Sequence, residues 1–426
     1  MNISHLRPEE YPIVIGLGFG DEGKGTIVDF LCQQRKTDYV IRFSGGPQTA
    51  HNVVTSDGRE HTFALFGSGT FQGAGTILTK EVLVNPFNLV AEANALNKLT
   101  GRDVLDTLLI SESALLITPL HVLANQQREI NRGNSRHGSC GQGVGEAKGY
   151  ALRQTPEDPI RMQDLKDLHT LKTKLIKLND HLRSAIPNFD GAMDIENIMS
   201  SYEAMMTYEN LRIMSDDRLM TVIGDRSLTF VVEGSQGVLL DEDYGFIPHT
   251  TWSSVVSKNA ERLLIDAGVS EKDITVIGIT RTYTTRHGAG PFPSEYLDPK
   301  TIALYPEKHN AWGEFQGGWR VGALDVSLLT YALEVNDGVD WIALTHCDVL
   351  PVKEAVVGWE KEFRPAPRDP AYQYSELTET AKSVIESSIE TYEDVDGLAE
   401  IINRVTNTNV SLLSFGPTAE DKRWNR

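Results

Sequence analysis

The sequence of 426 residues predicts an α/β protein built on one large, mostly parallel, doubly wound sheet flanked by helices. The first observation is an immediate order of strand, helix and strand, because apolar runs at 11–18 and 38–46 flank the amphipathic segment 25–34. The second is that apolar, β-rich runs return later, each ending in a polar or glycine-containing turn. Repeated alternation of strands and helices favours a parallel sheet whose ligand sites gather at the carboxyl ends of the strands. The later runs span 228–237, 274–283, 340–350 and 410–417.

Helical patterns connect and follow these runs. A longer stretch, 162–218, is charged and helix-periodic without a strand signal, so we expect a helical insertion there. The chain has no internal repeat, low-complexity tract or long linker. We therefore expect a single P-loop-like α/β domain over residues 1–426 that contains the insertion. The other helical patterns span 118–133, 254–268, 325–338 and 376–392.

Composition excludes several kinds of partner. The net charge of −19 argues against nucleic acid and anionic membranes, because both require clustered Lys and Arg. Small anionic ligands stay compatible, since a pocket can be locally rich in backbone donors. Cys32, Cys140 and Cys347 are far apart in the sequence, which fits a reduced, cytoplasmic setting. No secretory leader pattern is present, and no apolar run approaches the roughly 18 residues of a membrane span.

The stretch VIGLGFGDEGKGTIVDFL, residues 14–31, looks like an altered phosphate-binding loop. Lys24 stands where the lysine of a P-loop would stand, but Gly25 separates it from the hydroxyl residue Thr26. A strand before the loop and a helix after it would aim backbone N–H groups and the positive end of the helix at an anion. Asp21 would repel phosphate there unless it binds magnesium or transfers a proton. A plain glycine turn that enters a helix is the alternative.

A second glycine-rich loop, RFSGGPQTAHNVV at residues 42–54, follows the next strand-like run. Its histidine, His51, would lie at the carboxyl end of a strand, beside the phosphate loop, where it could act as an acid. Taken alone, such a histidine is equally compatible with a structural role.

Together these segments resemble the adenylosuccinate synthetase family, whose members join aspartate to inosine monophosphate using GTP. The resemblance rests on GDEGKG after a strand, on the IVDFL that follows, and on an Arg-aromatic-x-Gly-Gly stretch that leads to a histidine. It extends over nearly the whole chain through HGSCGQGVGEA, VVEGSQGVLLD, TRHGAGPFPSE, THCDVL and SFGP, in the family's order. It implies a carbon–nitrogen ligase of purine biosynthesis that works as a cytoplasmic homodimer.

The resemblance also gives the acidic residue of the phosphate loop a chemical role. Asp21 would take the proton from N1 of the purine, so that the 6-oxygen attacks the γ-phosphate of GTP. His51 would stabilise the developing charge and protonate the departing group, and the amino group of L-aspartate would then displace phosphate. One Mg2+ per subunit would be held by Asp21 and a backbone carbonyl, which Ala50 can supply if its φ is negative. Lys24 and Gln236 complete the implied catalytic set.

Further roles carry over motif by motif. Asp348 matches the carboxylate that reads guanine, since a carboxylate accepts hydrogen bonds from N1–H and the 2-amino group of that base. Arg320 matches an arginine of the loop that binds aspartate and GTP, and Arg153 is the nearest match to an arginine that crosses the dimer interface. The residues implied for the triphosphate are Gly20, Glu22, Gly23, Lys24, Gly25, His51, Arg320, His346, Asp348, Ser414 and Gly416. Those implied for the monophosphate are Asp21, Gln48, Ser139, Cys140, Arg153, Gln236 and Thr251.

Several loops depart from the family pattern. The family's Asn-Ala-Gly-His reads Gln-Thr-Ala-His at 48–51, and its Thr-Thr-Gly-Arg reads Ser-Cys-Gly-Gln at 139–142. Arg320 is the only arginine left in the aspartate loop, and one arginine is a poor bidentate partner for two carboxylates. His346 replaces a lysine two residues before Asp348. Compensating cations would have to come from Arg281, Arg286 or His309.

These departures leave alternatives open. A divergent, partly viral branch of the family uses GMP or dGMP and makes 2-aminoadenylosuccinate products, so such a substrate, with ATP or GTP as donor, is the alternative. Members of that branch replace the catalytic Asp by a smaller residue, so the retained Asp21 favours inosine monophosphate. A catalytically inactive purine-nucleotide-binding regulator is an alternative of another class, although Asp21, Lys24, His51 and Gln236 all survive. An ordinary P-loop NTPase switch fits worst, because Thr26 is out of place.

Overall fold

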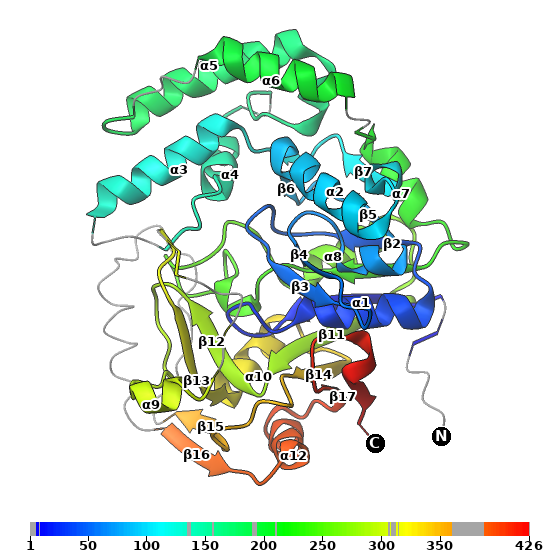
Figure 1. Cartoon of the computed structure of the whole chain (residues 1–426), viewed down its shortest axis with the longest axis vertical. Helices are drawn as coiled ribbons and strands as arrows, with labels where there is room; N and C mark the ends of the chain where they lie inside the picture. Colours follow the sequence, from blue (N-terminus) through cyan, green and yellow to red (C-terminus); the bar gives the residue numbers. More distant parts are fainter. Residues whose placement is uncertain are drawn as a thin grey trace.

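The computed structural model describes residues 6–7, 9–133, 138–155, 157–189, 194–208, 211–305, 307, 312–313, 315–359 and 387–425. A large sheet runs through the middle of the molecule with helices around it, as predicted (Figure 1). Neighbouring strands pair in parallel except at one edge, where β17 and β18 are antiparallel. In spatial order its ten strands are β18 (Lys422–Trp424), β17 (Val410–Ser414), β14 (Trp341–Thr345), β11 (Ile274–Arg281), β1 (Tyr11–Gly16), β10 (Phe230–Glu233), β2 (Tyr39–Arg42), β5 (Gly75–Leu78), β7 (Leu108–Ser111) and β9 (Ile213–Met214).

Helices cover both faces of this sheet, and further helices form an upper layer (Figure 1). No described helix is both long enough and apolar enough to cross a membrane. The helices are α1 (Lys24–Arg35), α2 (Pro86–Thr100), α3 (Pro119–Arg132), α4 (Val144–Arg153), α5 (Leu168–Ala185), α6 (Ile195–Tyr208), α7 (Asp216–Ile223), α8 (Ser257–Asp266), α9 (Pro299–Ile302), α10 (Val326–Val335) and α12 (Val395–Thr406).

The central strand β1 shows why the sequence folds in this way. All of its residues are buried. Ile13 and Ile15 belong to the core that includes α8 and α10, whereas Val14 belongs to the opposite core with Ile27 and Val28 of α1. Because successive side chains of a strand point to opposite faces, an uninterrupted apolar run is what a strand covered on both sides requires.

The stretch 162–218, expected as a helical insertion, contains a short 3-10 helix, Met162–Lys166, followed by α5 and α6. In Figure 1, α5 and α6 lie side by side above α3. Helix α5 contacts both α6 and α3. The stretch also contributes β9, which pairs with β7 at the edge of the large sheet. The helical layer is therefore tied to the main sheet at its far end.

A second, four-stranded sheet was not predicted. One predicted helix, 376–392, is wrong at its described end, because Ser387–Thr391 form β16, antiparallel to β15. Residues 376–386 lie outside the described residues. The five residues SSIET are too few to distinguish the 3.6-residue period of a helix from the two-residue period of a strand. Pairing with β15 makes this segment a strand. The order of this second sheet is β12 (Tyr283–His287), β13 (Trp319–Asp325), β15 (Glu354–Trp359) and β16, and the smaller pairs are β3 (His51–Val54) with β4 (Glu60–Phe63) and β6 (Leu83–Val84) with β8 (Leu115–Leu116).

Candidate active site

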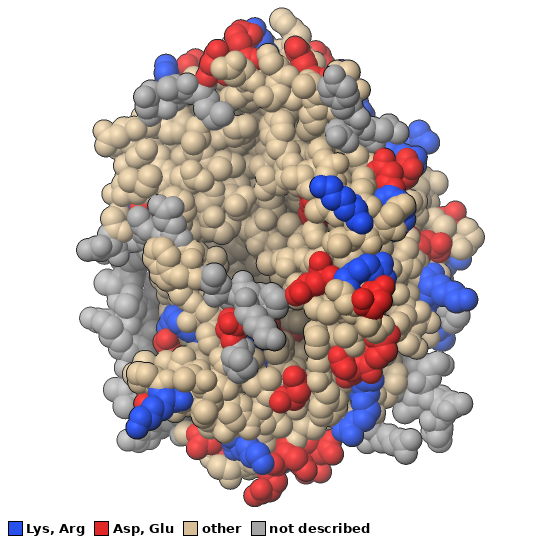
Figure 2. Space-filling model, viewed as in Figure 1, with Lys and Arg blue, Asp and Glu red and all other residues tan. Residues whose placement is uncertain are grey.

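Two cavities lie at the carboxyl ends of the central strands and share a wall. The loop cavity, about 460 Å³, is lined by the phosphate loop after β1, by residues 48–52 and by the ends of β14 and β17. The helix cavity, about 510 Å³, is lined by residues of α3 and α4 and by 247–252. Figure 2 shows a hollow near the centre of the face in view, below the helical layer. The shared wall, whose residues line both cavities, consists of Gln48, Gln236, Leu240, His287 and Gln316.

Glu22 organises the phosphate loop from the inside. Its carboxylate accepts hydrogen bonds from the backbone N–H groups of Gly18 and Gly20, at 3.0 and 2.7 Å, and from the ammonium of Lys24, at 2.7 Å. Glu22 and Lys24 are both buried. Lys24 lines the loop cavity but Glu22 does not. Glu22, predicted at the triphosphate, therefore shapes the loop and places Lys24.

Asp21 lines the loop cavity with a backbone φ of 62°, a left-handed conformation that is uncommon outside glycine. Burial raises the pKa of its carboxyl, and the nearby side chains of Arg281 and His287 act in the opposite direction. A carboxyl with a raised pKa is a stronger base than a carboxylate in water. The loop thus holds a potential proton acceptor beside Lys24.

A buried carboxylate orients the ring of His51 at the start of β3. Nδ1 of His51 lies 2.6 Å from Oε1 of Glu233. Oε1 also accepts a hydrogen bond from the hydroxyl of Ser68, and Oε2 accepts one from the backbone N–H of Ser68 at 3.0 Å. Burial raises the pKa of Glu233, but Arg42 and His51 outweigh it and bring the pKa to about 2. Burial lowers the pKa of His51 to about 4, against the opposite effect of Glu233. The imidazole is therefore neutral at pH 7, and its buried Nε2 has no hydrogen-bond partner among the described residues.

The shared wall carries amide groups without partners. Within the described residues, both polar atoms of the Gln48 side chain and Oε1 of Gln236 are buried without a hydrogen bond. Gln236 has a φ of 49°, so its backbone is also in the left-handed region. A buried polar group without a partner costs about 1 to 3 kcal/mol. The wall is therefore suited to a ligand that both donates and accepts hydrogen bonds.

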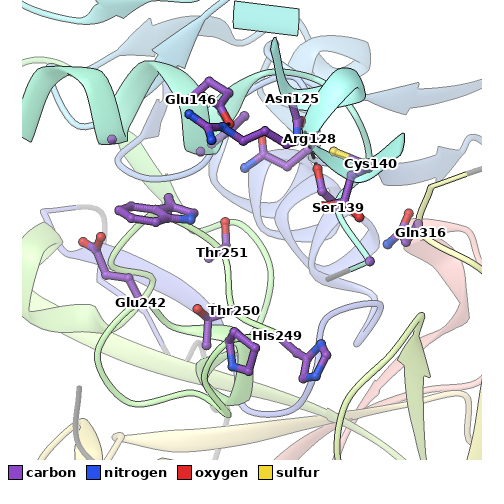
Figure 3. A pocket seen from close by; sticks show the side chains of 18 of the residues that line it. Asn125, Arg128, Ser139, Cys140, Glu146, Glu242, His249, Thr250, Thr251 and Gln316 are labelled. Carbon is purple, nitrogen blue, oxygen red and sulfur yellow. Dashed lines mark hydrogen bonds and ion pairs between the residues drawn. The ribbon is translucent and has the colours of Figure 1, made fainter. Parts of the chain in front are cut away.

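The helix cavity is lined by small polar groups on opposite sides (Figure 3). Ser139 donates a hydrogen bond to Oδ1 of Asn125 at 2.9 Å and accepts one from the backbone of Gly141 at 3.1 Å. Burial raises the pKa of Cys140, so its thiol stays protonated. Thr251 lies across the cavity from Ser139 (Figure 3). Cys140 and Thr251 can thus donate to an anionic group in this cavity, whereas the hydroxyl of Ser139 already donates to Asn125.

The arginines of the helix cavity differ in how they are engaged. Nε of Arg128 lies 2.7 Å from the carboxylate of Glu146, and Arg132 is paired with Glu129. Arg153, the last residue of α4, lines the cavity with an exposed side chain. Arg153 is therefore the most accessible of these three cations.

The far end of the loop cavity is formed by polar residues after β14 and β17. Arg281 contacts both ring nitrogens of His346, at 3.2 Å to Nδ1 and 2.6 Å to Nε2. Burial, together with Arg281, lowers the pKa of His346 well below its ordinary value. Burial raises the pKa of Asp348, whose side chain is nevertheless exposed. The residues of this end that were expected at the triphosphate, and that line the cavity, are His346, Asp348, Ser414 and Gly416.

Arg320 lines neither cavity. Its Nε donates to Glu295 at 2.7 Å, and its guanidinium also donates to the carbonyls of Gly288 and Gly290 at 3.0 and 2.9 Å. His309, named as a compensating cation, lies outside the described residues. Glu22 and Arg320 are thus the two residues expected at the triphosphate that do not line the loop cavity. All residues expected at the monophosphate line the helix cavity except Asp21, which lines the loop cavity.

A divalent cation fits beside the phosphate loop. Asp21 and Ala50 both line the loop cavity, and Ala50 is not among the residues with positive φ. Mg2+ is usually bound by one or two carboxylates, by water and by substrate phosphates. No group of three or more His, Cys, Asp or Glu that could hold a metal occurs within the described ranges. A cation at this place would therefore depend on bound phosphates.

Sequence reasoning missed two residues of the site. Glu233 ends the apolar run of β10. A carboxylate at the end of a buried strand indicates a polar or charged partner close by, because a buried carboxylate has to be paired. His287 is placed by the antiparallel register of β12 and β13, where it lies opposite Trp319. The sequence alone did not show that register.

A parallel sheet with a glycine-rich loop before a helix, a buried carboxyl in that loop and two cavities with a common wall are typical of an enzyme that brings a phosphorylated ligand and a second substrate to one centre. A family model described as adenylosuccinate synthetase matches residues 13–422. The chain belongs to the adenylosuccinate synthetase family, which is a family of ligases.

Curated relatives and solved structures agree with this membership. The chain is 32% identical over 357 residues to adenylosuccinate synthetase of Thermoplasma volcanium, an alignment that covers 81% of this chain and 77% of that protein. It is 29% identical over 429 residues to that of Neisseria meningitidis serogroup C, covering 96% and 97%. The fully ligated adenylosuccinate synthetase of Plasmodium falciparum has the same fold, with a TM-score of 0.79 at 23% identity over 98% and 100% of the chains. Cyanophage S-2L succinoaminodeoxyadenylate synthetase, bound to dGMP and dATP, is more distant, with a TM-score of 0.64 at 16% identity over 98% and 96%.

Proposed function

We propose that this ligase condenses L-aspartate with inosine monophosphate and converts GTP to GDP and phosphate. The observation that carries the proposal is the position of Asp21 and His51 in the loop cavity, next to a wall whose amides lack partners. Membership of the family supports the same reaction. The loop cavity would hold the triphosphate and the helix cavity the monophosphate, so that the purine 6-position meets the γ-phosphate at the shared wall.

The first step is a phosphoryl transfer. Asp21 takes the proton from N1 of the purine, for which burial of its carboxyl is favourable because it raises the pKa. The 6-oxygen then attacks the γ-phosphorus, the bond to the β-phosphate oxygen breaks, and GDP leaves. Lys24 and the amides at the start of α1 stabilise the phosphate charge. The amides of Gln48 and Gln236 hold the purine in register.

His51 has to gain a proton before it can donate one. In the free protein burial lowers its pKa to about 4, and Nδ1 faces Glu233. The negative charge of a bound triphosphate raises the pKa of a nearby imidazole, because it favours the charged form. His51 then donates from Nε2 to the phosphate oxygens, with Glu233 holding the imidazolium.

The second step is displacement of phosphate by the amine. The amino group of aspartate attacks carbon 6, the carbon–oxygen bond breaks, and phosphate leaves. When bound, Mg2+ would neutralise phosphate charge, and Asp21 and the carbonyl of Ala50 are the residues that would hold one ion per subunit. Arg153 is exposed on α4 and is the residue that we expect to reach the monophosphate of a second subunit in a homodimer.

A phosphate-release assay tests the proposal. Purified protein is given Mg2+, aspartate and each pair of a monophosphate (IMP, GMP or dGMP) and a triphosphate (GTP or ATP). We expect the highest kcat/KM for IMP with GTP, and Asp21→Asn should lower kcat by about 100- to 10,000-fold while leaving nucleotide binding measurable. Fastest turnover of GMP or dGMP would favour the 2-aminoadenylosuccinate reaction. Nucleotide binding without phosphate release from any pair would favour the inactive regulator.

A further inference from the structure

Among the described residues of the shared wall, His287 and Gln316 are the polar side chains to which neither nucleotide assigns a role, and His287 is the one whose ring nitrogen lacks a partner. It ends β12, opposite Trp319 of β13, and it lines both cavities. Its Nε2 is buried and has no hydrogen-bond partner in the described part of the chain. We propose that Nε2 of His287 donates a hydrogen bond to a carboxylate of the amino-acid substrate. The inference rests on the proposed function and adds a specificity-determining residue to it.

The arrangement of the wall favours a position next to His287 for aspartate, the third substrate of the proposed reaction. The triphosphate approaches from the phosphate loop and the monophosphate from the side of Ser139 and Thr251. The amine has to reach carbon 6 of the purine, which lies where the two cavities meet. Within the described residues, the remaining polar groups of that wall are His287 and Gln316, which come from the second sheet and from the turn before β13. Gln316 lies at the edge of the helix cavity in Figure 3.

The neighbouring guanidinium groups already have acceptors. Arg286 is buried and donates to the carbonyls of Ala289, Pro291 and His249, at 2.8 to 3.3 Å. The guanidinium of Arg320 is occupied by Glu295 and two carbonyls.

Arg281 is engaged in a similar way, because it donates to Thr285 at 2.9 Å and contacts His346. A dicarboxylate needs N–H donors, and taking any of these arginines from its partners would leave buried acceptors unpaired. Nε2 of His287 can donate without that loss.

Three variants of His287 test the hydrogen bond. His287→Val removes the donor, His287→Gln places an amide N–H near the position of Nε2, and His287→Asn is too short to do so. We expect His287→Val and His287→Asn to raise the KM for aspartate by about 10- to 150-fold, the effect of a lost hydrogen bond to a charged group. In the same variants, the KM values for IMP and GTP should differ from those of the unmodified protein by less than about threefold. His287→Gln should recover most of the aspartate affinity.

A binding measurement makes the test independent of turnover. Calorimetry measures the Kd of aspartate for the protein saturated with IMP, Mg2+ and a non-hydrolysable GTP analogue. The matched control is His169→Val, which makes the same change at an exposed histidine of α5 and should leave this Kd unaltered.

Equal effects of His287→Val and His287→Gln, or an aspartate Kd that His287→Val does not raise, would overturn the inference. A weaker aspartate Kd in His287→Val, together with no phosphate release by the unmodified protein, would uphold the inference as a binding assignment and overturn the proposed catalytic function alone.

Discussion

The carboxylate of Glu22 and the ammonium of Lys24 form a buried ion pair, 2.7 Å apart, beneath the phosphate loop. The other carboxylate oxygen of Glu22 accepts hydrogen bonds from Gly18 and Gly20 of the same loop. One side chain thus fixes the loop backbone and the lysine together. Removal of one partner of a buried pair leaves the other charge uncompensated.

Glu22→Ala should therefore destabilise the protein by about 3 to 5 kcal/mol, as measured by urea unfolding. GTP should restore part of this loss, because its phosphates supply a counter-charge for Lys24 and ligand binding stabilises the folded state. Glu9→Ala is a control, since Glu9 is 46% exposed and its pair with Arg7 is on the surface. An unchanged urea midpoint for Glu22→Ala would show that the pair does not organise the loop.

Glu233→Gln tests the orientation of His51. The variant removes the charge that opposes the effect of burial on the pKa of His51, so the imidazolium becomes harder to form. We expect kcat to fall by about 100-fold with little change in the KM for GTP. NMR titration should show a lower pKa of His51 in Glu233→Gln than in the unmodified protein, both without a ligand and with a GTP analogue bound. Equal pKa values of His51 in the two proteins would contradict this role.

The buried His121 should make the free energy of unfolding depend on pH. Burial lowers its pKa to about 3, whereas an unfolded histidine titrates near 6.5. Stability is therefore fully present above pH 6.5 and is lost as the pH falls toward 3, because only the unfolded state binds the proton. His121→Gln should be less acid-sensitive than the unmodified protein, by about 3 kcal/mol between pH 7 and pH 4.

Urea unfolding at these two pH values measures the effect, and the same change at the exposed His169 is the control. Parallel loss of stability in the His121→Gln variant and the unmodified protein would contradict the assignment.

Lys422 holds the loop after β17 against α1. Its ammonium donates to the hydroxyl of Thr26 at 2.5 Å and to the carbonyls of Gly416 and Thr418 at 2.9 and 2.6 Å. Gly416 lines the loop cavity. Lys422→Met keeps the length of the side chain but removes these bonds, so the KM for GTP should rise about tenfold and the KM for IMP much less. A rise of equal size in both constants would indicate a general loss of structure.

The main sheet could be predicted because its strands are short apolar runs between turn signals, a local pattern that burial on both faces imposes. The second sheet could not. Its strands pair residues far apart in the chain, such as His287 with Trp319, and the polar content of β16 gives no decisive period. Pairing between distant segments is decided by tertiary packing, which a single sequence does not display.

Some residues of the site could likewise be predicted from the sequence, and others could not. Asp21, Lys24 and His51 could be found because they lie within or at the end of glycine-rich loops that follow β1 and β2. The engagement of Arg320 by Glu295 could not be foreseen, since a free and a paired arginine look the same in a sequence. The sequence also could not show that the side chain of Glu22 points into the phosphate loop, because this orientation depends on three contacts within the folded loop.

The common wall of the two cavities separates what must stay constant from what can vary over evolution. Lys24 lines the loop cavity, which we propose for the triphosphate, and Ser139 with Thr251 lines the helix cavity, which we propose for the monophosphate. Substitutions at Gln48 or Gln236 alter only the surface that meets the reacting ring. If the proposed assignment holds, a few replacements in this wall can exchange one purine for another without any change in the two phosphate-binding regions or in the sheet beneath them.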